Sequence, residues 1–129
     1  MIGILVVSHG ALAKELVASA QMLMGEGLQL GYEGIMPEDS SECFYQRVNQ
    51  LADQVDTGTG VLVLADLYGG TPCNTVALLS RQRSIRVVTG VNLPMVMAAI
   101  SERTEETTLD ELAELLAATG TEGIARFSI

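Results

Sequence analysis

The stretch "GILVVSHGALAKEL", residues 3–16, decides the fold because it joins a buried strand to a helix with almost no loop between them. Residues 2–7 form an apolar run rich in β-branched side chains, which is typical of a strand covered on both faces in a parallel sheet. His9, the only histidine of the chain, lies where this strand ends. The helix that follows has an apolar stripe at helical spacing, made of Leu12, Leu16, Ala20 and Leu23.

Strand and helix patterns alternate along the rest of the chain. Further apolar runs predict strands at 28–35, 61–65, 85–89 and 124–129, and two glycines in the first of these favour an edge position. Helical patterns separate them, with two consecutive helices before the last strand. This order predicts one α/β domain, residues 1–129, with a doubly wound, mainly parallel sheet and helices on both faces.

Helix boundaries are predicted from capping patterns. Asp39 with Glu42 and Thr108 with Glu111 have the spacing of a capping box. Thr71 is a candidate N-cap, because a proline follows it at the first helical position. Glycine 120 is expected to end the last helix.

Composition excludes several classes of function. Sixteen acidic residues against seven basic ones give a net charge of −9, which argues against a nucleic acid or an anionic membrane as the main partner. Cys43 and Cys73 form no CxxC pair, so no metal site or other cofactor is predicted. No apolar run reaches the ~20 residues of a membrane-spanning helix, and no secretory signal is present. We therefore expect a cytoplasmic protein with reduced thiols.

Three strand ends carry residues suited to chemistry, namely 8–10, 66–71 and 89–92. Ligands of open α/β sheets bind beyond the carboxyl ends of strands. If the strands at 2–7 and 61–65 are neighbours, about 4.8 Å apart, His9 and Asp66 are expected to share a hydrogen bond. A carboxylate on one imidazole N–H fixes the tautomer and leaves the other nitrogen as a nucleophile.

Backbone groups near this pair are suited to an anion. The helix that opens after Gly10 and the turn Gly69-Gly70-Thr71 predict N–H groups that a phosphoryl group can approach, and Thr71 adds a hydroxyl. Four neighbours are candidates for lining the same crevice: Ser8, Leu67, Asn92 and Met95.

Each of these signals also has an ordinary structural explanation, such as a capping histidine or a simple strand-to-helix turn. The P-loop and nucleophile-elbow patterns are absent, which excludes an ordinary ATP-binding kinase. One alternative is a receiver-like module phosphorylated on Asp66. Residues 8–10 stand where a receiver needs an acidic pair, and the only lysine, Lys14, lies in the first helix. A purely structural or small-anion-binding domain would leave His9 unmodified.

Three motifs carry a resemblance to a known family. The motifs "GILVVSHGALAKEL" (3–16), "VLVLADLYGGTPCNTVALL" (61–79) and "VVTGVNLPMVMAAI" (87–100) resemble, in order and spacing, the IIA domains of the mannose–fructose–sorbose class of the bacterial sugar phosphotransferase system. The resemblance covers essentially the whole chain.

The resemblance implies a phosphotransferase that relays a phosphoryl group in sugar uptake. His9 would accept the group from the histidine-containing phosphocarrier protein and pass it to a IIB domain, with membrane components involved only indirectly. Asp66 would hold the imidazole, and the turn at 69–71 would hold the phosphoryl oxygens.

The resemblance also implies features of the fold: a sheet with the first strand between the second and third, and a homodimer that exchanges an antiparallel C-terminal strand. The same domain occurs in regulatory proteins and in the phosphotransfer subunit of dihydroxyacetone kinase. Because no DNA-binding or ATPase segment is seen here, we expect the transporter role.

Overall fold

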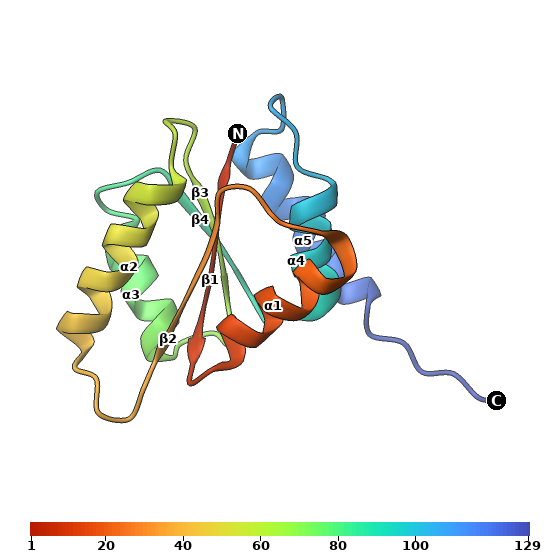
Figure 1. The fold of residues 1–129 in the computed structure, drawn as a ribbon, viewed down its shortest axis with the longest axis horizontal. Coiled ribbons are helices and arrows are strands. Elements are labelled where there is room, and N and C mark those ends of the chain that lie inside the picture. The colour runs from red at the N-terminus through yellow and green to blue at the C-terminus, as the bar shows by residue number, and fades with distance from the viewer.

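A computed structural model describes all residues, 1–129, as a parallel sheet between two layers of helices (Figure 1). The sheet order is β2-β1-β3-β4 and every pairing is parallel, which confirms the predicted α/β class and the place of the first strand between the second and third. The elements are β1 (Gly3–His9), α1 (Leu12–Met24), β2 (Leu30–Ile35), α2 (Ser41–Val55), β3 (Val61–Ala65), α3 (Thr71–Leu79), β4 (Ile85–Thr89), α4 (Leu93–Ser101) and α5 (Leu109–Glu122).

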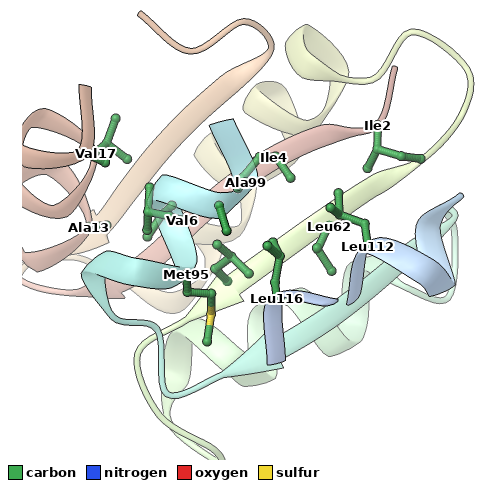
Figure 2. Packing of buried hydrophobic residues seen from close by; sticks show 14 of the residues in the cluster. Ile2, Ile4, Val6, Ala13, Val17, Leu62, Met95, Ala99, Leu112 and Leu116 are labelled. Carbon is green, nitrogen blue, oxygen red and sulfur yellow. The ribbon is translucent and has the colours of Figure 1, made fainter. Parts of the chain in front are cut away.

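The two central strands are buried on both faces, as their continuous apolar sequence predicts. Alternate side chains of β1 and β3 point to opposite sides of the sheet. One set packs with α1, α4 and α5, and Figure 2 shows this cluster. The other set packs with α2 and α3. With both faces covered, only the strand ends and the sheet edges are left for function.

Helix α1 buries a different stripe from the one predicted. Its buried residues are Ala13, Val17 and Ala20, whereas Leu12 and Leu23 are about half exposed. Alanine at two of these positions lets α1 approach α4 closely, and its cluster also contains alanines from that helix. Close packing between helices therefore overrides the leucine spacing.

Two helix starts differ from the predicted caps by one residue. The N-cap of α2 is Ser40, whose hydroxyl accepts the Cys43 N–H, while the Asp39 carboxylate accepts the Met36 N–H in the preceding loop. The N-cap of α3 is Gly70, so Thr71 is already helical. The Thr71 hydroxyl is thereby left free of a capping role.

Helix α5 begins at the predicted cap but runs past Gly120. The Thr108 hydroxyl accepts the Glu111 N–H, and the helix continues to Glu122. Gly120 is required for packing, because a Cβ there would collide with the Met95 methyl group. It was therefore wrong to expect Gly120 to end the helix.

Residues 124–129 form no strand within the single chain and extend away from the body of the molecule (Figure 1). Ile124, Phe127 and Ile129 are all strongly exposed. Strand β4 pairs only with β3, so its other edge is unpaired. Exchange of this segment between two copies stays a prediction. None of the helices has the length and apolar character needed to cross a membrane.

Candidate functional site

His9 and Asp66 meet at the carboxyl ends of β1 and β3, as the strand order predicts. The Nδ1 atom of His9 lies 2.7 Å from Oδ2 of Asp66, and the His9 backbone N–H donates to the same oxygen at 2.8 Å. The second carboxylate oxygen accepts the Leu67 N–H at 2.9 Å. The Asp66 side chain is only 8 % exposed, whereas that of His9 is 52 % exposed. A fixed carboxylate therefore holds an accessible ring.

The protonation of this pair follows from the contacts of Asp66. Burial acts to raise the pKa of Asp66, but the hydrogen bonds from His9 and Leu67 outweigh it and bring the pKa below its ordinary value. An ionised carboxylate only accepts, so Nδ1 of His9 carries the proton of the shared bond. Nε2 is then the nitrogen with a free lone pair.

The turn between β3 and α3 lies directly against the imidazole. A Cβ on Gly70 would come 2.9 Å from Cε1 of His9, and Gly69 has φ +85°. The amides of Gly69, Gly70 and Thr71 and the Thr71 hydroxyl have no acceptor within the chain. They lie at the N-terminus of α3, where the helix dipole favours negative charge. The arrangement suits a phosphoryl group beside Nε2.

A hollow of about 400 Å³ contains the imidazole. The loop after β2 supplies one side of it, and the sequence analysis did not identify that loop. The signal was available, because a first strand flanked by the second places the end of β2 beside His9. The lining residues are His9, Gly10, Ile35, Met36, Pro37, Asp39, Ser41 and Thr71.

Two predicted residues beside His9 have structural tasks instead. Gly10 borders the hollow, but its N–H donates to the Ile35 carbonyl at 2.8 Å and so does not point to a ligand. Ser8 is fully buried, and its hydroxyl accepts the Ala13 N–H at the start of α1. Ser8 therefore caps a helix and does not line the crevice.

Asn92 and Met95 are not brought to His9. The Asn92 side chain caps α4 and donates to the Gly120 carbonyl, and both residues line a separate hollow between the end of β4 and α5. The sheet order explains this separation, because β4 is two strands away from β1. Leu67, in contrast, lies exposed in the turn that holds Gly70.

A family model described as "PTS system fructose IIA component" matches residues 3–117, which include every element of this site. The chain belongs to this IIA family. IIA proteins are phosphotransferase components of the sugar phosphotransferase system (PTS), and the fold and the His9–Asp66 pair lie within the matched range.

Individual relatives agree with the family. The IIA chain is 33 % identical over 124 residues to the "PTS system mannose-specific EIIAB component" of Escherichia coli strain K12, covering 95 % of this chain and 38 % of that protein. It is 28 % identical to the "PTS system fructose-specific EIIA component" of Bacillus subtilis strain 168, covering 80 % of this chain and 71 % of that one. The chain thus spans about two fifths of the length of the first curated relative.

A solved structure has the same architecture as this IIA chain. The mannose/sorbose-specific IIA subunit of Enterococcus faecalis superposes with a TM-score of 0.90 at 31 % identity, covering 99 % of this chain and 96 % of that one. The sheet and its helices are therefore those of a complete IIA subunit of that type.

Proposed function

We propose that residues 1–129 are one IIA domain that carries a phosphoryl group on His9 between two proteins of a sugar transporter. The donor is the phosphorylated histidine-containing phosphocarrier, and the acceptor is a IIB domain. The observation that carries the proposal is the imidazole with Nδ1 fixed by Asp66 and Nε2 free in a hollow. The naming of a relative as an EIIAB component supports a IIB domain as acceptor.

The geometry suggests how the group arrives. The lone pair of Nε2 attacks phosphorus while the P–N bond to the phosphocarrier breaks, and the donor imidazole leaves with that electron pair. The Nδ1 proton stays on the His9 ring beside Asp66, so the ring becomes a phosphorylated imidazolium. The free amides at 69–71 and the Thr71 hydroxyl stabilise the phosphoryl oxygens during transfer.

The same pair explains how the group departs. A protonated ring is a better leaving group than a neutral one, and Asp66 stabilises its positive charge until the P–N bond breaks. Transfer to the nucleophile of the IIB domain then restores neutral imidazole with the proton still at Nδ1. His9 therefore acts as a reversible carrier and needs no metal ion or nucleotide in this scheme.

The proposal includes a homodimer in which residues 124–129 of each chain add to the free edge of β4 in its partner. The exposed apolar side chains of this segment and the unpaired edge of β4 support it.

Phosphorylation by the labelled phosphocarrier tests the function directly. Wild-type protein should take up one phosphoryl group that is labile in acid and stable in base, and His9→Ala should take up none while keeping its thermal stability. Label that persists in His9→Ala would contradict the proposal. Label that is lost in base would instead indicate an aspartyl phosphate on Asp66.

A further inference from the structure

The loop between β2 and α2, residues 36–40, carries a carboxylate into the His9 hollow. Asp39 lines that hollow and is bonded to Arg47 of α2, which does not itself line it. We propose that Arg47 is a positioning residue for phosphoryl transfer, which neutralises Asp39 and fixes this loop against the His9 turn. The inference rests on the proposed function of His9 and extends it to a residue outside the hollow.

Arg47 is held from three sides. Its Nη2 lies 2.9 Å from Oδ2 of Asp39, and its Nε donates to the Glu33 carboxylate of β2. Its guanidinium lies over the ring of the fully buried Phe44, 5.8 Å from the ring centroid. A planar guanidinium with two carboxylates and an aromatic face has little freedom to move. Arg47 thus ties strand, loop and helix together.

The loop is connected to His9 through backbone contacts. Met36 and Asp39 close it, because the Met36 N–H donates to the Asp39 carboxylate at 2.8 Å and the Asp39 N–H donates to the Met36 carbonyl at 3.0 Å. The preceding residue, Ile35, pairs with His9 in the sheet and accepts the Gly10 N–H at 2.8 Å. A shift of the loop therefore reaches the turn that aims the imidazole.

Charge gives Arg47 a second effect. Hydrogen bonds from the Met36 backbone and from Arg47 lower the pKa of Asp39, so its carboxylate is ionised at neutral pH. An ionised carboxylate in the hollow repels an incoming phosphoryl group. Contacts with Glu33 and Asp39 raise the pKa of Arg47, so the compensating positive charge is permanent.

Two phosphoryl donors separate positioning from docking. The phosphocarrier must dock on the protein, whereas phosphoramidate is a small molecule: its P–N bond breaks as Nε2 of His9 bonds to phosphorus, ammonia leaves, and the Nδ1 proton stays on the ring. Arg47→Met should slow phosphorylation by both donors by roughly tenfold or more. Arg47→Lys, which keeps the charge but not the fork, should recover part of the rate. Asp39→Asn added to Arg47→Met should also recover part of it.

Arg83→Met is the matched control. Arg83 pairs with Asp53 and Asp56 beside the same helix, but before β4 and hence at the opposite end of the sheet from His9. It should lower the melting temperature and leave both phosphorylation rates unchanged.

Four results would overturn the positioning role: equal loss of rate in both arginine variants, loss with the phosphocarrier alone, no loss with either donor, or no recovery in the double variant. Wild-type protein that accepts from phosphoramidate but not from the phosphocarrier would refute the proposed function. The comparison of Arg47 and Arg83 variants with phosphoramidate would still decide the role of Arg47.

Discussion

Gly70 lies so close to His9 that a methyl group on it would come 2.9 Å from Cε1 and 3.6 Å from Nε2 of the imidazole. Its φ of −80° is one that alanine adopts readily, so the conflict is with the ring and not with the backbone. Gly70→Ala should therefore displace the imidazole from Asp66 and slow phosphorylation roughly 10²-fold, with little change in the free energy of unfolding. Single-turnover kinetics measures the first, and urea denaturation the second.

Gly69→Ala should show the opposite behaviour. A Cβ there meets nothing within 4 Å, but the φ of +85° is unfavourable for alanine. We expect a loss of about 1–2 kcal/mol in the free energy of unfolding and a phosphorylation rate close to that of the wild type. If Gly69→Ala slowed transfer as much as Gly70→Ala, the change would reflect disturbance of the whole turn rather than contact with His9.

Asp66→Asn should slow transfer in both directions by about 10²-fold or more while leaving phosphocarrier binding nearly unchanged. The amide removes the charge that stabilises the imidazolium, and its NH₂ group favours the tautomer with the proton on Nε2. Single-turnover rates for gain and loss of the phosphoryl group test this, with calorimetric binding as the control. Unchanged rates in either direction would exclude the proposed role of Asp66.

The stability contributed by Asp66 should depend on pH with a defined sign. Its folded pKa is lowered, so its stabilising effect is fully present above the unfolded value of about 3.9 and is lost as the pH falls through the folded pKa. The difference in unfolding free energy between wild type and Asp66→Asn should be constant near neutral pH and shrink below about pH 4. Urea denaturation at a series of pH values measures it; a difference that grows in acid would contradict the assignment.

Ser8→Ala should destabilise the fold without altering the chemistry. The buried Ser8 hydroxyl accepts the Ala13 N–H at 2.8 Å, and its loss leaves that donor buried without a partner. We expect about 1–2 kcal/mol less unfolding free energy and a phosphorylation rate per folded molecule equal to that of the wild type. A specific loss of rate would mean that the serine contributes to the site after all.

Removal of residues 124–129 should convert a dimer into a monomer. Burying Phe127 and Ile129, which are both exposed in the single chain, is worth about 1.5–3 kcal/mol each in every subunit. The truncated protein should also unfold at lower temperature and aggregate through the free β4 edge. Size exclusion with light scattering decides the matter. A full-length monomer, or a truncated protein that remains a dimer, would exclude strand exchange as the main contact.

The parts of the fold that the sequence predicted best are those with the strongest local pattern. The runs that became β1 and β3 are buried on both faces, so their composition alone identifies them, and the contact of His9 with Asp66 follows once they are neighbours. The α1 stripe failed because alanine packing, a tertiary effect, decided which face is buried. Asn92 was placed in the wrong hollow because distance across the sheet is not written in the strand that carries it.

The β2–α2 loop was missed for a different reason. Its residues include no histidine, no glycine pair and no other sign of chemistry, so only the sheet order brings Met36 and Asp39 to the hollow. The roles of Gly10 and Ser8 could not be separated either, because both are polar or flexible positions beside His9. Whether such a group faces a ligand or caps a helix depends on hydrogen bonds that form only in the folded chain.

The Nδ1 contact with Asp66 has a kinetic consequence under the proposed function. Because the ring cannot turn over without losing that contact, only Nε2 is offered, and it opens onto one hollow. The protein that delivers the phosphoryl group and the protein that removes it must therefore occupy the same surface in turn. Steady-state kinetics should be double-displacement, with parallel reciprocal plots, and an excess of unphosphorylated donor should inhibit the acceptor competitively.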